Sequence, residues 1–188
     1  MLGDVDPEVR AQTAKVLGDG RVSAAFDGLV KALKDESPRV RFFATLSLGK
    51  LGKKEAVPAV IEMLRANNDL DTFLRHAGAM ALAGINDKKS LAAAAQNVSP
   101  AVRMGVLLAM RKLESPEIAI FLADKEPKLV LEDARAINDA AITGAQPKLA
   151  NVLASINPAA TGKNIGTGAT AGYDPLVVRA INANFRVG

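Results

Sequence analysis

The sequence lacks cysteine and tryptophan, has a single tyrosine, and only 4% of its residues are aromatic. Without cysteine, the 188-residue chain can form no disulfide, thiolate metal site, cysteine nucleophile or thioether bond to haem. No apolar run approaches the ~20 residues that cross a membrane, and the N-terminal MLGDVDPEVR lacks the basic-then-apolar order of a signal peptide. Sulfur chemistry is therefore excluded from this chain, and no membrane span is predicted.

Basic residues only slightly outnumber acidic residues. The chain has 24 lysines and arginines against 20 acidic residues, a net charge of +4 that is spread along its length. Such a balance predicts a weakly basic surface and is poor support for nucleic-acid binding. Hydrophobic residues are abundant, at 49%, and most are Ala, Leu and Val. This composition favours a folded, all-α protein of closely packed helices.

A turn followed by an apolar stretch occurs six times along the chain. The clearest copies are DVDPEVRAQTAKVLGD, DESPRVRFFATLSLGKLG and DLDTFLRHAGAMALAGI, and three weaker copies follow. Aligned on the proline of the turn, the copies are anchored at Pro7, Pro38, Thr72, Pro100, Pro127 and Pro175. The spacings are 31, 34, 28, 27 and 48 residues. A period near 30 indicates one supersecondary unit per repeat.

Each copy has the features of a helix start. A proline fits the first helical position, whose N–H has no intrahelical partner. A short polar side chain before it can accept a hydrogen bond from a free N–H of the first turn. The predicted N-caps are Asp6, Ser37, Asp71, Ser99 and Asp174, with Glu126 as a weaker one.

Shorter amphipathic stretches lie between these helices, such as the one that contains Val57, Val60, Ile61 and Leu64. A helix pair of this kind cannot bury its own apolar faces, but stacked pairs can share a core. We therefore predict an all-α, right-handed α-solenoid of antiparallel helix pairs. It forms one domain over residues 1–188, with about five and a half repeats.

The motifs DVDPEVR, DESPRVR and NVSPAVR, each followed by an Ala/Leu-rich helix, resemble the bacterial short form of the HEAT repeat family. The resemblance covers nearly the whole chain. It implies a structural ladder in which the Asp of one repeat holds the Arg and the turn amides of its neighbour. The ladder residues are Asp4, Arg10, Asp35, Arg41, Asp69, Arg75, Asn97 and Arg103. Val130 and Val178 replace the arginine in the last two copies, so the ladder should be broken towards the C-terminus.

The same arginine row could instead bind an anion or a phosphate, because a guanidinium group presents a planar fork of donors. The structural interpretation is favoured, since each arginine is accompanied by its own acid or amide. His76 is the only histidine, and no cysteine or second histidine could join it around a metal. We expect it to form a hydrogen bond within the stack. No metal site, cofactor or catalytic residue is predicted.

Residues 157–174, NPAATGKNIGTGATAGYD, interrupt the period with Gly, Ala, Thr and Asn. Their glycines lack the spacing of a phosphate-binding loop. A surface insertion is expected here, and a partner-binding loop is the alternative.

A closer resemblance involves SPRVRFFATLSLGKLG, FLRHAGAMALAGI and VRAINANFRVG, which look like the HEAT region of large exported dehydrogenase and c-type cytochrome proteins. It implies that the segment is a fragment, periplasmic or secreted, between a propeller dehydrogenase domain and a haem domain. The leading prediction is thus a non-enzymatic scaffold whose partners are proteins or neighbouring domains of the same chain.

Two other functions stay open. Short HEAT-like repeats also occur in phycobilin lyases, which attach bilins to proteins, and this alternative rests on repeat similarity alone. Nucleic-acid binding through basic pairs such as Lys53 and Lys54 is the other, and the shortage of aromatic residues makes it less favoured. The oligomeric state is not predicted.

Overall fold

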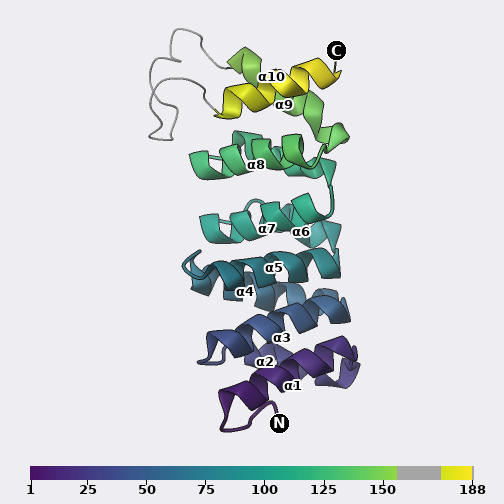
Figure 1. Ribbon diagram of the computed structural model, residues 1–188, viewed down its shortest axis with the longest axis vertical. Helices are drawn as coiled ribbons and strands as arrows, with labels where there is room; N and C mark the ends of the chain where they lie inside the picture. The colour runs from purple at the N-terminus through teal and green to yellow at the C-terminus, as the bar shows by residue number, and fades with distance from the viewer. Residues whose placement is uncertain (156–174, 188) are drawn as a thin grey trace. The chain divides into compact units, whose positions relative to one another are not determined.

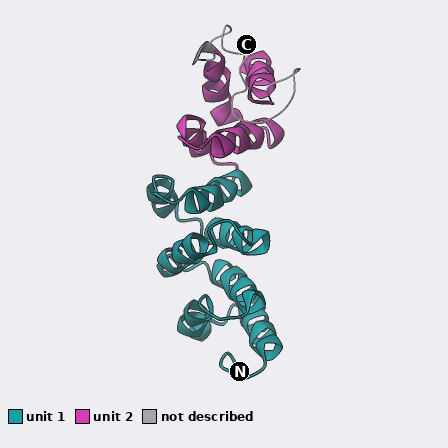
Figure 2. Ribbon diagram, turned by 90° about the vertical axis from the view of Figure 1, so that its left-hand side faces the viewer, with its two compact units in different colours: residues 1–113 teal, residues 114–188 magenta. Residues whose placement is uncertain are grey.

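The computed structural model describes residues 1–155 and 175–187. The chain divides into two compact units, Met1–Leu113 and Glu114–Gly188, which Figure 2 shows in teal and magenta. All regular secondary structure in the described residues is helical, and the helices follow one another as antiparallel pairs. The predicted all-α class and α-solenoid architecture are confirmed.

Unit 1 contains inner helices that pack side by side and outer helices that cover them (Figure 1). The inner helices are α1 (Pro7–Asp19), α3 (Pro38–Leu51), α5 (Thr72–Ile85) and α7 (Pro100–Lys112). The outer helices are α2 (Phe26–Ala32), α4 (Val57–Asn67) and α6 (Lys88–Ala94), with the 3₁₀ turns η1 (Ser23–Ala25) and η2 (Lys54–Ala56) leading into α2 and α4.

The inner helices of unit 1 begin where the turn motif predicts, but their caps are of two kinds. Asp6 accepts a hydrogen bond from the N–H of Glu8, and Asp71 accepts from Phe73 and Leu74. These are ordinary N-cap bonds.

Ser37 and Ser99 occupy the N-cap position of α3 and α7 without a side-chain cap bond, so the predicted role of their hydroxyls is wrong. Instead their own N–H groups donate to Asp35 Oδ1 at 2.9 Å and to Asn97 Oδ1 at 3.0 Å. The acid or amide two residues earlier orders the turn because its side chain can reach this N–H. Glu126 likewise makes no side-chain cap bond, and Asp174 lies outside the described residues.

Small residues let the inner helices approach closely. A Cβ atom on Gly49 of α3 would lie 2.6 Å from Ala81 Cα of α5, a distance that real Cβ atoms do not tolerate. Val40, Ala44 and Leu48 of α3 are fully buried. Gly52 ends α3 with a left-handed φ of 67°, which glycine adopts without steric cost. Gly52 therefore serves helix termination in this copy.

Unit 2 contains η3 (Pro116–Ala123), α8 (Pro127–Asp139), η4 (Thr143–Ala145), α9 (Gln146–Ser155) and α10 (Pro175–Val187). The outer element of this repeat, η3, is a 3₁₀ helix and not an α-helix. Its three-residue turn places Ile118 and Phe121 on one face, and both are buried. α8 packs against η3, and α9 packs against α10. The predicted insertion at 157–174 lies outside the described residues.

No helix in the described ranges is long and apolar enough to cross a membrane.

Candidate functional site

In three inner helices, the side chain of the arginine at the fourth position forms hydrogen bonds with the main chain of the turn before that helix. In each, Nη1 donates to the main-chain carbonyls six and five residues earlier. The distances are 2.9 and 3.2 Å from Arg10 to Asp4 and Val5, 2.9 and 3.3 Å from Arg41 to Asp35 and Glu36, and 2.8 and 3.2 Å from Arg103 to Asn97 and Val98. The repeated six-residue interval is thus explained by a side chain to backbone contact.

The most buried of the ion pairs between the first two repeats of unit 1 joins Arg10 and Asp35. Arg10 donates from Nε to Asp35 Oδ2 and from Nη2 to Asp35 Oδ1, both at 2.8 Å. This is the bidentate geometry that suits a guanidinium and a carboxylate. The Arg10 side chain is 9% exposed and that of Asp35 13% exposed. Hydrogen bonding to Arg10 lowers the pKa of Asp35 below its usual range, against the opposing effect of burial.

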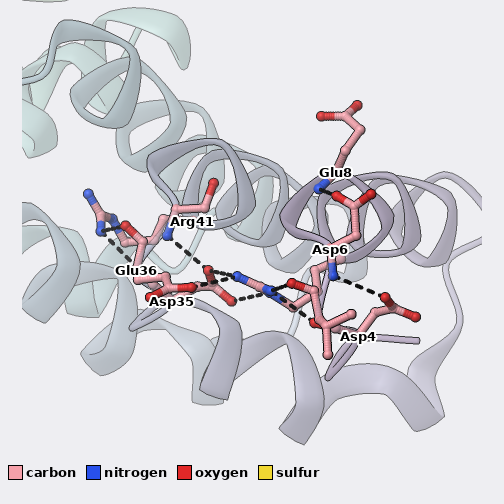
Figure 3. A network of polar contacts seen from close by, with 9 residues as sticks. Asp4, Asp6, Glu8, Asp35, Glu36 and Arg41 are labelled. Carbon is pink, nitrogen blue, oxygen red and sulfur yellow. Dashed lines mark hydrogen bonds and ion pairs between the residues drawn. The ribbon is translucent and has the colours of Figure 1, made fainter.

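The turn before α1, which Figure 3 shows, is held in the same way as the turns before α3 and α7. The Asp4 carboxylate accepts from the N–H of Asp6 at 3.1 Å, and Arg10 contacts Asp4 through its main-chain oxygen. The predicted ladder has each Asp hold the turn amides of a neighbouring repeat. The structure shows instead that Asp4, Asp35 and Asn97 each hold an amide of their own turn.

Asp69 pairs with the arginine of its own copy. Arg75 Nη1 lies 2.6 Å from Asp69 Oδ1, and both side chains are about a quarter exposed, at 26% and 22%. Asn68 and Asp69 have left-handed φ values of 46° and 63°, and this reversal turns Asp69 towards Arg75. Asp69 therefore does not form the bidentate pair with Arg41 that Asp35 forms with Arg10.

Arg41 is consequently the arginine of the row without a carboxylate. It forms no ion pair within the described part of the chain, and its charge only weakly lowers the pKa of Asp35, which Arg10 already engages. No described residue accepts a hydrogen bond from its Nε or Nη2. In Figure 3, Arg41 lies beside Asp35 and Glu36, whose carbonyls hold its Nη1 group.

Arg41 lines a groove of about 710 Å³ in unit 1, which we name the Arg41 groove. Its lining comes from α2 and the residues after it, from α3, from α4 and from α5. The lining residues are Val30, Leu33, Lys34, Arg41, Pro58, Ala59, Glu62, Met63, Ala66, Asn67 and Leu74. Leu33, Met63 and Leu74 are buried, whereas Lys34 and Glu62 are exposed. The result is a mostly apolar groove with three charged side chains.

Sequence reasoning missed this groove, although one signal was present. The second spacing, from Pro38 to Thr72, is 34 residues, the longest in unit 1. The extra residues make α4 eleven residues long, against seven for α2, and produce the left-handed turn at Asn68 and Asp69. The longer spacing therefore coincides with the repeat in which the pairing of the ladder changes, since Asp69 pairs with Arg75 and not with Arg41.

Three other candidates do not form a ligand site. His76 is exposed and makes no hydrogen bond in the part of the chain that the structure describes, so its predicted bond within the stack is wrong. No group of three or more potential metal ligands is present among residues 1–155 and 175–187. Arg179 donates from Nη1 to Pro175 O at 2.9 Å, while its buried Nε has no partner among those residues.

Asp133 of α8 is a buried acid with a strongly raised pKa. It is fully buried, and neither carboxylate oxygen has a hydrogen-bond partner among the described residues. Burial raises its pKa to about 8, and the nearby backbone of Leu122 opposes the shift only in part. In the repeat alignment it occupies the position of Ala44 and Val106, which belong to the core. Because no ligand can reach it, Asp133 is a structural feature of unit 2.

The turn geometry and the stacked helix pairs agree with a family comparison. Residues 1–83 match the model of the HEAT repeats family. The prediction of HEAT repeats is thereby confirmed for this part of the chain.

Two curated relatives come from Nostoc sp. strain PCC 7120. The "Phycocyanobilin lyase subunit alpha" is 38% identical over 96 residues, which are 46% of this chain and 34% of the relative. The "Bilin biosynthesis protein PecE" is 37% identical over 97 residues, which are 48% of this chain and 38% of the relative. The chain thus spans little more than a third of the length of these relatives.

Among solved structures, the complex of CpcE and CpcF of phycocyanin lyase from Nostoc sp. PCC 7120 contains a similar chain. The TM-score is 0.51 at 22% identity, and the alignment covers 100% of this chain and 92% of that chain. At this identity the similarity shows the fold alone.

The relatives correct two predictions. The spacer between a dehydrogenase and a cytochrome domain is wrong, and so is the non-catalytic scaffold, because the matching proteins carry the names of a lyase subunit and a bilin biosynthesis protein. The expectation of an exported protein depended on the dehydrogenase resemblance. The physical reason for the error is that the Asp-x-x-Pro-x-Val-Arg motif reflects only how the turn before the helix is held. HEAT proteins of unrelated activity share this turn geometry.

Proposed function

We propose that this chain acts on bilins as part of a bilin lyase, and that the Arg41 groove is where it holds the bilin. The observation that carries the proposal is the similarity of nearly half of the chain to two bilin-handling proteins, at 38% and 37% identity. The phycobilin-lyase alternative left open by the repeat similarity is therefore favoured over the scaffold.

The groove supports this proposal by its size and lining. Small-molecule sites usually measure roughly 300–1,000 Å³ and are mainly apolar with a few placed polar groups. The Arg41 groove, at about 710 Å³, lies within that range. A bilin is an open-chain tetrapyrrole with a largely apolar body and propionate side chains, so apolar walls and a cation are the features it requires.

The composition limits what the chain contributes to the attachment step. The chain contains no cysteine, so it cannot itself form a thioether to the bilin. In the proposed activity it holds and orients the bilin, and an acceptor protein supplies the nucleophile. We also propose a second protein subunit as partner, since the relative is named as one subunit of its lyase and the structural neighbour comes from a two-protein complex.

The test is to titrate the purified chain with phycocyanobilin and record the visible absorption and circular dichroism. We expect saturable binding with an induced circular dichroism signal. Ala59→Trp, which places an indole in the groove, should weaken binding by about tenfold or more. Ala93→Trp is the matched control, because Ala93 is exposed on α6 and does not line the groove. Equal loss in both variants, or no binding by the wild-type chain, would overturn the proposal.

A further inference from the structure

We infer that Arg41 is the carboxylate anchor of the Arg41 groove and binds a propionate of the bilin through its Nε and Nη2 edge. This inference rests on the proposed function for the identity of the ligand. The anchor itself follows from a comparison of Arg41 with Arg10, which stands at the same position one repeat earlier.

Arg10 shows what this position does when an acid is present. Its Nη1 is held by the two turn carbonyls, and its Nε and Nη2 bind the Asp35 carboxylate at 2.8 Å each. Arg41 repeats the first half of this arrangement, with Nη1 held by the carbonyls of Asp35 and Glu36 at 2.9 and 3.3 Å. Its Nε and Nη2 edge is thus oriented but has no acceptor among the described residues.

The acid that would occupy this edge is turned away by the backbone. Asp69 is the counterpart of Asp35 in the next copy, but the left-handed turn at Asn68 and Asp69 directs its carboxylate to Arg75. The longer α4 and this turn are local features of one repeat. As a result, the Arg41 guanidinium is held by the turn carbonyls but has no carboxylate partner among the described residues. A guanidinium held in this way loses little conformational freedom when a carboxylate binds.

The other charges of the groove do not neutralise Arg41. Glu62 also lines the groove, but it forms an ion pair with Arg65 three residues later on α4. Lys34 is exposed in the groove lining and adds to the positive charge. The buried side chains of Leu33, Met63 and Leu74 provide an apolar surface beside this charge. An elongated apolar molecule that bears a carboxylate is the complementary ligand.

The experiment compares binding of biliverdin, which has two free propionates, with its dimethyl ester. The wild-type chain should bind the diacid about tenfold or more tightly than the diester, because a charge-assisted bidentate contact is lost on esterification. Arg41→Gln should remove this preference while diester binding changes little. Arg39→Gln is the matched control, since Arg39 lies on the same helix and pairs with Glu8 outside the groove.

A second variant keeps Arg41 in place in case Arg41→Gln disturbs the turn. Ala66→Glu adds an acid to the groove at an exposed position of α4, and it should abolish the diacid preference without changing the melting temperature. Ala93→Glu is its control on α6. Equal binding of diacid and diester by the wild-type chain would overturn the anchor and leave the proposed function standing. Absence of binding by either compound would overturn both.

Discussion

Unit 1 and unit 2 are built from the same kind of helix start, but they treat buried charge differently. In unit 1, Arg10 is buried and pairs with Asp35, so the charges satisfy each other. In unit 2, Val130 of α8 stands where the arginine would be, and the fully buried Asp133 three residues later has no hydrogen-bond partner among the described residues. This difference shows that the repeat pattern specifies the backbone geometry of the helix start. Whether a buried charged side chain is paired is determined separately in each repeat.

The largest expected effect concerns Asp133. Its folded pKa of about 8 lies above the unfolded value of 3.8, so the folded protein holds a proton that the unfolded chain releases between these pH values. The contribution of this group to stability is fully present below about pH 4 and is lost as the pH rises through about 8. We expect the free energy of unfolding to fall by a few kcal/mol over this window, on the order of 1.4 kcal/mol per pH unit at most.

Denaturant unfolding measured from pH 4 to pH 8 tests this dependence. Asp133→Asn, which cannot ionise, should flatten the profile and be the more stable protein at pH 8. Glu132→Gln is a suitable control because it removes the same charge from the same helix at a residue that is not fully buried. A wild-type profile as flat as that of Asp133→Asn would show that Asp133 ionises freely, and thus that the carboxyl is hydrated in the folded protein.

The ion pair of unit 1 should give the next largest effect. Asp35→Ala removes the bidentate partner of Arg10 and the acceptor of the Ser37 N–H. It leaves the buried guanidinium with only a long ion pair, of 3.5 Å, to the exposed Glu36. The expected loss is roughly 1–3 kcal/mol in the free energy of unfolding. Asp4→Ala should cost less, because the Asp4 carboxylate accepts only the N–H of Asp6 in an exposed turn. Thermal melts of both variants measure the difference, and equal losses would contradict a special role for the Arg10–Asp35 pair.

The smallest expected effect comes from adding a ladder arginine to unit 2. Val130→Arg places a guanidinium at the fourth position of α8, six residues after Asp124, where it could donate to the turn carbonyls as Arg41 does. Part of the gain from such hydrogen bonds is offset by desolvation of the guanidinium and by lost side-chain entropy, so the net effect should be about 1 kcal/mol or less. Chemical denaturation should therefore show a slight stabilisation. A clear destabilisation would mean that the turn before α8 does not present its carbonyls in the way that the turns of unit 1 do.

The functional site was harder to predict than the fold for a physical reason. The arginine row could be identified from the sequence because its members lie at a fixed distance from the helix start. Which carboxylate each arginine meets depends on the loop that brings in the next repeat, and a few extra residues suffice to divert Asp69 from Arg41 to Arg75. The groove could not be predicted, since its walls come from four helical segments whose separation depends on packing.

The sequence by itself determined that the chain is an all-α stack of helix pairs and where the inner helices begin. Prolines, short polar caps and helical apolar stripes act over a few residues, so they can be identified without knowledge of the fold. Only the tertiary structure decided that Arg10 and Asp35 pair, that Arg41 lines a mostly apolar groove and forms no ion pair with a described residue, and that Asp133 is buried. These outcomes depend on side chains that are 25 or more residues apart, or on burial between helices, and neither is encoded in any local pattern.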